Sequence, residues 1–486
     1  MSAKPKSESA VMGIFFNYAN TLVNYGFAVI YVIVLTRFVP ITQYGYYNAI
    51  IAFTGIISLF FPSFGVDNAI AKEAAEAHAK GGDVNPYYSA MMALTITITM
   101  ASSITLIAAI PLLKIPASLI PILYIIISTN LLNTIANSMG FYLWLTQRTA
   151  TQGKGMTMGS LVYRVSEIAL IIIMRNVYAI AIANLLNVVT ALAYYAYNVR
   201  IIPSIRLGLI VLKRRIMQFL NSGFQFWLAW YINNMGSNAL NYMVYLYLGP
   251  QYSALFGIST LMMSAVSNFS QAVGNVFGST AAHSRSLGGD VGRTAMEYSI
   301  AAIAVAGVLS IAAIAMLPLL PIIHVLNGDY AAALPYAALL FGLSPLTALD
   351  GVYMMYYWIM GRGWSAVQRA AAGVVTSIIL FVAMVGSMGL YAAVLASYMG
   401  FLATAILYWL NNRPWSPRMW LMLTASTLLP TISALIYAMH PIYWPLPQLI
   451  TAIILVLLLL IVKPLPKSTV GQVPPLLRRV ITWFTR

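Results

Sequence analysis

Apolar runs of membrane-spanning length recur along the chain, and no other feature limits its fold as strongly. A run of roughly 20 apolar residues crosses the hydrocarbon core of a bilayer as one helix. Turn-forming residues such as Pro40, Gly249-Pro250 and Gly361 separate the runs. We therefore predict an all-α polytopic membrane protein with about 14 transmembrane helices, near residues 11–37, 44–66, 86–113, 117–145, 155–175, 177–199, 216–247, 251–282, 294–324, 331–361, 363–386, 388–411, 417–439 and 443–462.

The charge of the chain fits this prediction. Only 7% of its residues are charged, whereas soluble domains carry roughly 25%. The net charge of +16 could indicate nucleic acid as a partner. The Lys and Arg residues, however, concentrate in alternate loops, as they do in the cytoplasmic loops of membrane proteins. We expect a multi-pass protein of the cell membrane, with both termini in the cytoplasm and no nucleic-acid partner.

Metal and cofactor chemistry has no support in the sequence. The chain contains no cysteine, so thiolate ligands and disulfides are excluded. Its four histidines do not stand in a metal-ligand spacing. We therefore predict neither a metal site nor a cofactor.

The two halves of the chain share an internal repeat. Each copy has a proline-containing turn, a Tyr or Phe followed by Gly, and a Gly-Gly-Asp, which ends at Asp83 in the first copy and at Asp290 in the second. Six predicted helices separate equivalent points, so the halves have the same orientation in the membrane. Repeats of this kind place the substrate path at their interface. We predict two parallel six-helix lobes, residues 1–210 and 211–415, followed by two extra helices within 416–465 and a basic cytoplasmic tail, 466–486.

Amide side chains form stripes on three predicted helices. An isolated buried Asn is explained by a hydrogen bond between helices, worth about 0.6 kcal/mol. Stripes on helices that the repeat makes equivalent favour a water-filled cavity, and neutral amides suit sugar hydroxyls. We predict that these amides bind substrate: Asn17, Asn20, Asn24, Asn234, Asn238, Asn241, Asn268, Gln271 and Asn275.

Four charged residues lie within or at the ends of predicted spans, and we also predict them as substrate-binding. A charge at the bilayer centre costs roughly 2.5–3.5 kcal/mol, so such residues line cavities or form pairs. Arg164 and Glu167, at i and i+3, form either a structural ion pair or a functional site. Asp350 is either functional or a partner of Arg164, which we take as the only basic residue deep in a span. Arg37 anchors a helix end or contacts an anionic headgroup.

The segment Arg37-Phe-Val-Pro40, followed by Tyr44-Gly45, Asn48 and Phe64-Gly65, resembles the polysaccharide-transporter branch of the multidrug/oligosaccharidyl-lipid/polysaccharide (MOP) exporter superfamily. The resemblance implies two lobes around a cavity that opens alternately to each side. It also implies cavity cations that hold a phosphate, and a groove for the lipid tail at the two extra helices. The several arginines of the lipid II branch in helices 1 and 8 are absent, which argues against lipid II as substrate.

Together these features predict a transporter and not an enzyme. Dehydrating one unpaired sugar hydroxyl costs about 2–7 kcal/mol, and a polar cavity removes that cost. We predict a flippase that exports an oligosaccharide linked to a polyprenyl phosphate or pyrophosphate from the cytoplasmic to the outer leaflet by alternating access. Its partners are that lipid-linked oligosaccharide, the membrane lipids, and H⁺ or Na⁺ as candidate coupling ions.

Two alternatives stay open. A cation-coupled (H⁺ or Na⁺) multidrug exporter of the same superfamily would use Glu167 or Asp350 as its cation-binding carboxylate. A membrane-embedded glycosyltransferase or polymerase would need catalytic acids near the headgroups or a sizeable outer loop. The ten acidic residues are scattered and the predicted outer loops are short, so the enzyme is the weakest of the three interpretations.

Overall fold

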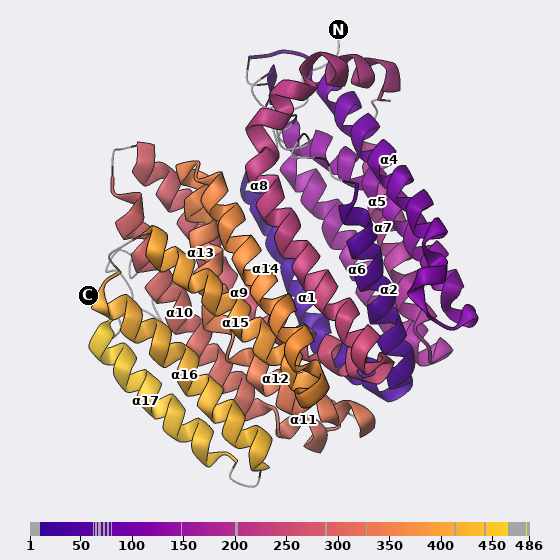
Figure 1. The fold of residues 1–486 in the computed structure, drawn as a ribbon. Helices are drawn as coiled ribbons and strands as arrows, with labels where there is room; N and C mark the ends of the chain where they lie inside the picture. The colour runs from indigo at the N-terminus through magenta and orange to yellow at the C-terminus, as the bar shows by residue number, and fades with distance from the viewer. Residues whose placement is uncertain are drawn as a thin grey trace. The chain divides into compact units, whose positions relative to one another are not determined.

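The computed structural model describes residues 10–61, 63, 66, 70, 73–74, 77–78, 80–146, 148–199, 203–286, 289–326, 328–412, 415–441, 444–464 and 483. Over these residues the fold is all-α, with no strand (Figure 1). Eight helices of this part are long and apolar enough to cross a membrane, or nine if one bent pair forms a single span. The all-α membrane fold is confirmed, while the count of 14 spans stays a prediction.

The chain divides into two compact units, Met1–Tyr231 and Ile232–Arg486, which we call the N-terminal and C-terminal units. The boundary lies within one long helix. The lobe boundary predicted at residue 210 falls in the same helix and stays a prediction.

In the N-terminal unit, α6 packs against α1 and α7, and α5 packs against α7 and α4. This order places the charged helix α6 directly against the Asn-rich helix α1. The elements are α1 (Ala10–Phe38), α2 (Ile41–Leu59), α4 (Asn85–Ala108), η1 (Ile110–Leu113), η2 (Ala117–Leu119), α5 (Ile120–Leu145), α6 (Thr149–Met174), α7 (Tyr178–Asn198) and the start of α8 (Ile205–Leu248).

In the C-terminal unit, α10 packs against α9, α13 and α16, and α14 pairs with α15. The helices predicted as extra, α16 and α17, pack against each other and against α10. The elements are the end of α8, α9 (Pro250–Ser286), α10 (Val291–Met316), α11 (Leu319–Ile322), η3 (Gly328–Ala333), α12 (Leu334–Phe341), α13 (Ser344–Met360), α14 (Gly363–Met388), α15 (Leu390–Asn411), α16 (Pro417–Met439) and α17 (Leu446–Val462).

The turns that separate the helices lie where the sequence predicts them. Gly249 has a φ of 90° between α8 and α9, and Gly361 has a φ of 70° between α13 and α14. A side chain at a positive φ is strained, so glycine is favoured at both turns. The repeat motif also occupies equivalent places, because Pro40 directly precedes α2 and Pro250 begins α9.

One predicted loop is helical. The predicted spans 177–199 and 216–247 leave residues 200–215 between them, but α8 already begins at Ile205. A Cβ atom at Gly208 would lie 2.3 Å from the backbone oxygen of Ser89, so this glycine lets α8 approach α4 closely. Leu212 is buried in the same contact, beside Ala90 and Ala93. Tertiary packing therefore extends the helix through a segment that lies outside the predicted spans.

One predicted span is broken. Residues 331–361 form η3, α12 and α13, and the two halves meet at a bend of 50° after Phe341. Pro345 cannot donate a backbone hydrogen bond to the carbonyl of Phe341, four residues earlier. That carbonyl instead accepts a hydrogen bond from Ser310 Oγ of α10, at 2.7 Å. Broken helices are tolerated at membrane depth when neighbouring helices satisfy the freed backbone groups in this way.

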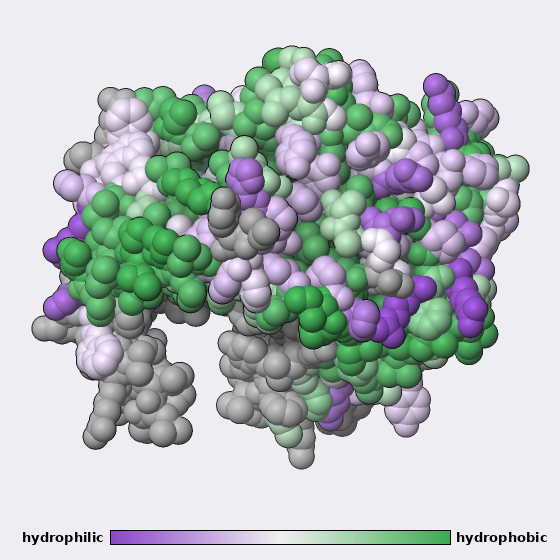
Figure 2. All heavy atoms as spheres, turned by 90° about the horizontal axis from the view of Figure 1, so that it is seen from below, coloured by the Kyte–Doolittle hydropathy of each residue, from purple (hydrophilic) through white to green (hydrophobic). Residues whose placement is uncertain are grey.

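The outer surfaces of the helices suit lipid. Figure 2 shows hydrophobic side chains over large areas of the face seen from below. Individual examples are Ile173 on α6, Ile379 on α14 and Ile461 on α17, which are 75%, 61% and 74% exposed. Lipid is the solvent in which such apolar helix faces are stable.

Candidate functional site

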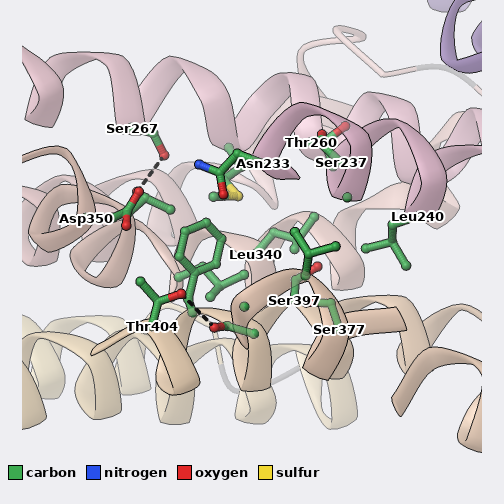
Figure 3. A pocket seen from close by; sticks show the side chains of 18 of the residues that line it. Asn233, Ser237, Leu240, Thr260, Ser267, Leu340, Asp350, Ser377, Ser397 and Thr404 are labelled. Atoms are coloured by element: carbon green, nitrogen blue, oxygen red, sulfur yellow. Dashed lines mark hydrogen bonds between the residues drawn. The ribbon is translucent and has the colours of Figure 1, made fainter. Parts of the chain in front are cut away.

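The C-terminal unit contains a pocket of about 580 Å³, which we call the C-terminal pocket. Five helices, α8, α9, α13, α14 and α15, supply most of its wall, together with Leu340 of α12 and Leu343 at the bend after it (Figure 3). The polar residues of its wall are Asn233, Asn234, Ser237, Asn241, Thr260, Ser264, Ser267, Asn268, Thr347, Asp350, Arg369, Ser377, Ser397 and Thr404.

Neutral side chains dominate this polar wall. Amides and hydroxyls both donate and accept hydrogen bonds, so they can match groups of either kind on a ligand. The charged residues of the wall are Asp350 and Arg369, and they pair with each other. The pocket therefore combines many neutral polar groups with one neutralised ion pair.

The ion pair of the pocket joins two neighbouring helices. Arg369 on α14 donates to Asp350 Oδ1 on α13 at 2.7 Å, and Tyr408 on α15 donates to the same oxygen at 2.8 Å. The Arg369 side chain is 2% exposed and the Asp350 side chain 17% exposed, so the carboxylate is the more accessible partner. Asp350 therefore presents an anion that is backed by a buried guanidinium.

This geometry corrects two sequence predictions. We had considered Arg164 as a possible ion-pair partner of Asp350. We had also taken Arg164 as the only basic residue deep in a predicted span. Asp350 instead pairs with Arg369, which lies inside α14 and is almost fully buried. The loop between α13 and α14 is short, so the two helices form a hairpin that brings residues on either side of Gly361 to similar depths. That hairpin register was the sequence signal for the pair.

Some of the predicted amides on α8 and α9 line the C-terminal pocket, and others do not. Asn234, Asn241 and Asn268 line the C-terminal pocket, whereas Asn238 does not. Asn233 and Ser237 line it as well, although neither was predicted. These residues show that the lining face of α8 is rotated slightly from the predicted stripe. The side chains of Gln271 and Asn275 on α9 lie outside the described residues.

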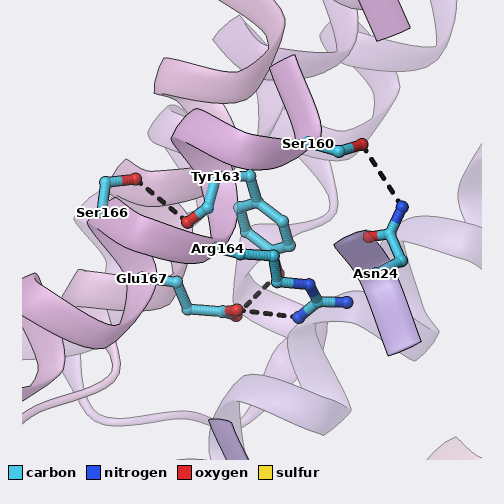
Figure 4. A network of polar contacts seen from close by, with 6 residues as sticks. All are labelled: Asn24, Ser160, Tyr163, Arg164, Ser166 and Glu167. Carbon is cyan, nitrogen blue, oxygen red and sulfur yellow. Dashed lines mark hydrogen bonds and ion pairs between the residues drawn. The ribbon is translucent and has the colours of Figure 1, made fainter. Parts of the chain in front are cut away.

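A second polar site lies in the N-terminal unit, between α1 and α6. Arg164 donates to Glu167 Oε2 at 2.8 Å, and Tyr163 donates to Glu167 Oε1 at 2.7 Å (Figure 4). The Arg164 guanidinium also lies over the rings of Tyr163 and Tyr31, at 4.8 and 5.8 Å from their centroids. The ion-pair interpretation of Arg164 and Glu167 is confirmed, and their binding of substrate stays a prediction.

The remaining predicted residues lie on α1. Asn24 donates to Ser160 Oγ of α6 at 3.3 Å and to the backbone oxygen of Asn20 at 3.0 Å, so it forms part of a contact between helices. The side chain of Asn17 lies outside the described residues. Arg37 is exposed in the last turn of α1. It is six residues beyond Tyr31, or roughly 9 Å along the helix axis.

Comparisons with known proteins agree with this fold. A family model described as "Polysaccharide biosynthesis protein" matches residues 10–277. None of the curated proteins matches the chain. Among solved structures, the lipid II flippase MurJ in an inward closed conformation is similar, with a TM-score of 0.63 and 10% identity over 91% of this chain and 97% of that chain.

Two MATE transporters are also similar. An inward-facing multidrug resistance transporter of the MOP superfamily has a TM-score of 0.59 and 16% identity over 85% of this chain and 99% of that chain. A eukaryotic MATE transporter has a TM-score of 0.57 and 15% identity over 86% of this chain and 97% of that chain. Identities this low establish the fold alone. The family model covers more than half of the chain, and the chain therefore belongs to the polysaccharide biosynthesis protein family.

Proposed function

We propose that the protein is a flippase of the cell membrane that exports a lipid-linked oligosaccharide from the cytoplasmic to the outer leaflet. Its carrier is a polyprenyl phosphate or pyrophosphate, and both termini of the protein lie in the cytoplasm. The observation that carries the proposal is the C-terminal pocket, which has a wall of amides and hydroxyls inside an apolar membrane protein. The family and the fold support transport across a membrane, and the pocket supports a glycan as the cargo.

The chemistry of the pocket suits sugar hydroxyls. Each hydroxyl loses its water on entering a membrane, at a cost of about 2–7 kcal/mol unless a new hydrogen bond replaces it. Asn241 on α8 and Asn268 on α9 offer a donor and an acceptor in one side chain, and Ser377 and Ser397 add hydroxyls from α14 and α15. A volume of about 580 Å³ lies in the range of roughly 300–1,000 Å³ that is usual for ligand sites.

The phosphate of the carrier requires a cation, and Arg164 is the candidate in the N-terminal unit. Its side chain is 17% exposed, whereas that of its partner Glu167 is fully buried. The more accessible partner of this pair is therefore Arg164, and the planar donors of a guanidinium suit phosphate oxygens. We propose that Arg164 contacts the phosphate, with Glu167 holding the guanidinium in place.

A cation-coupled multidrug exporter is the second candidate, because MATE transporters share the fold. Such an exporter needs a carboxylate that is available to H⁺ or Na⁺. Glu167 and Asp350 each already pair with an arginine at 2.8 and 2.7 Å. An added cation would then leave a net positive charge within the membrane, which is costly. This favours the glycan flippase.

Flipping in vesicles tests the proposal. The purified protein is placed in vesicles that contain a fluorescent undecaprenyl-pyrophosphate-linked oligosaccharide, and the lipid left in the outer leaflet is quenched with time. We expect faster leaflet exchange than in protein-free vesicles and in vesicles that contain an unrelated polytopic protein. Exchange at the protein-free rate, combined with Na⁺- or H⁺-dependent efflux of a drug, would replace the proposal with the multidrug exporter.

A further inference from the structure

The carboxylate of Asp350 has one oxygen occupied and one available. Both of its hydrogen bonds, from Arg369 and from Tyr408, go to Oδ1. Oδ2 has no hydrogen-bond partner in the part of the chain that the structure describes, and the side chain is 17% exposed on the wall of the pocket. A carboxylate oxygen accepts about two hydrogen bonds, so Oδ2 lacks donors that a ligand could supply.

The charges around Oδ2 determine which ligand fits. Arg369 neutralises Asp350 and, although it also lines the pocket, is only 2% exposed, so the carboxylate is the more accessible of the two charges. A ligand carboxylate or phosphate would meet the oxygen of Asp350 before it reached the guanidinium, and like charges at short range repel. A metal cation would give the neutral pair a positive charge inside the membrane. A neutral donor, such as a hydroxyl or an amide N–H, meets neither cost.

The neighbouring groups also suit a neutral ligand. Thr347, one helical turn before Asp350, donates to Ser267 Oγ at 3.2 Å and to the backbone oxygen of Ser344 at 2.9 Å. Ser267 and Asn268 on α9 line the same pocket. Figure 3 shows Asp350 and Ser267 at one end of the view and Leu240 at the other. That end therefore combines one carboxylate oxygen, two hydroxyls and an amide, with no exposed cation among its described residues.

We infer that Oδ2 of Asp350 accepts a hydrogen bond from a hydroxyl or amide N–H of the transported glycan, and that this subsite selects a neutral sugar over one that carries a carboxylate or phosphate. Arg369 and Tyr408 are positioning residues that hold Oδ1, so that Oδ2 points to the ligand. The inference rests on the proposed function, because it takes the glycan as the cargo of this pocket. It separates the glycan, bound in the C-terminal unit, from the carrier phosphate assigned to Arg164.

Two matched lipids test the inference. Both are fluorescent undecaprenyl-pyrophosphate-linked disaccharides, and they differ only in a terminal glucose or glucuronic acid. A third lipid with a terminal sugar phosphate distinguishes a general exclusion of anions from an exclusion of carboxylates. Initial flipping rates are measured with the full-length wild-type protein in vesicles without Na⁺ and again in vesicles with Na⁺. We expect the neutral lipid to flip about tenfold faster than either anionic one, the ratio that one hydrogen bond to a charged group produces.

The double variant Asp350→Asn/Arg369→Gln shows whether this pair sets the ratio. It removes both charges together, so no unpaired charge stays buried. We expect the ratio of neutral to anionic flipping to fall from about ten to about one. The matched control is Glu297→Gln, which breaks a more exposed Arg–Glu pair on α10 outside the pocket, and we expect it to keep the wild-type ratio.

The outcomes separate the inference from the proposed function. Equal wild-type rates for the neutral and anionic lipids would overturn the inference and leave the flippase intact. A wild-type rate that requires Na⁺, with the requirement lost in the double variant, would identify Asp350 as a cation site and also overturn it. Exchange of all three lipids at the protein-free rate would overturn both. The comparison of lipids on the wild-type protein decides the inference even if the double variant does not fold.

Discussion

In the N-terminal unit, Arg164 and Glu167 lie one turn apart on the same helix, whereas in the C-terminal unit Asp350 and Arg369 lie on two helices of a hairpin. The two pairs also differ in which partner is accessible. Arg164 is 17% exposed over a fully buried Glu167, and Asp350 is 17% exposed over a nearly buried Arg369. One unit therefore presents a cation and the other an anion, each backed by its counter-charge.

The orientation of an ion pair within a membrane protein can therefore determine which ligand binds, because it decides which of the two charges is accessible. A substrate with an anionic carrier and a neutral glycan needs both kinds of contact. The N-terminal pair offers donors to a phosphate, and the C-terminal pair offers an acceptor to a hydroxyl. A pair within one helix forms with that helix, while a pair between helices also depends on their packing. The two sites should therefore respond differently to mutation.

We expect the largest loss of stability when the Asp350–Arg369 pair is broken by replacing Asp350, its more accessible residue. Asp350→Ala leaves the Arg369 guanidinium buried without a carboxylate. Removing one partner of a buried pair lowers the free energy of unfolding by about 3–5 kcal/mol. Unfolding of the purified protein in detergent by chemical denaturant measures the change. A loss below about 1 kcal/mol would show that the guanidinium finds water or another partner, and that the pair is not a buried one.

A smaller effect is expected in the N-terminal unit. Glu167→Ala removes the acceptor for Arg164 and Tyr163, but Arg164 is partly exposed and can be hydrated. We expect the free energy of unfolding to fall by about 2 kcal/mol, between the cost of a lost hydrogen bond and that of a fully buried charge. The same denaturant experiment compares the two alanine variants directly. A greater loss than in Asp350→Ala would reverse the order of burial described above.

Transport tests the cation of the N-terminal pair. Arg164→Gln should lower the initial rate of pyrophosphate-linked lipid flipping by about tenfold, because a hydrogen bond to a charged group is lost. Arg164→Lys keeps the charge and should retain most of the rate. Flipping per folded protein is measured after size-exclusion chromatography. An unchanged rate in Arg164→Gln would remove this residue from phosphate binding, and equal losses in both variants would indicate a structural role.

The smallest effect is expected at the bend that leads into α13. Ser310→Ala removes the hydroxyl that satisfies the carbonyl of Phe341, and an unpaired buried acceptor costs about 1 kcal/mol or more. Since α13 carries Asp350, we expect the ratio of neutral to anionic flipping to fall about twofold, while the contribution of Arg164 is unchanged. The matched control is Ser128→Ala, which removes an exposed hydroxyl bonded only within its own helix α5. Identical behaviour of the two variants would show that the bend does not position Asp350.

Helices and their ends could be predicted from the sequence because they follow local rules. Apolar runs and turn residues placed α16 at its observed bounds and α14 within two residues of them. The spacing of Arg164 and Glu167 allowed an ion pair for the same reason, since residues at i and i+3 are neighbours on any helix. The bend after Phe341 was missed, although Pro345 marked the position.

Contacts between helices could not be predicted in the same way. Arg369 lies 19 residues from Asp350, and Tyr408 lies 58 residues away, so only the packing of α13, α14 and α15 brings them together. Single hydroxyls such as Ser377 and Ser397 leave no stripe in the sequence, yet they line the pocket. The amides of α1 showed the same stripe as those of α8, but Asn24 bonds to Ser160 of α6. Sequence spacing identifies which residues share a helix face, but it does not identify the helix that packs against that face.

The central claim is that the protein carries a glycan on a polyprenyl phosphate or pyrophosphate, with the glycan in the C-terminal pocket. Native mass spectrometry of lipid that co-purifies with the wild-type protein and with the Asp350→Asn/Arg369→Gln variant measures this most directly. We expect a bound polyprenyl-linked oligosaccharide without acidic sugars on the wild-type protein, and about tenfold lower occupancy on the variant. Equal occupancy of the two proteins by ordinary phospholipid alone would contradict it.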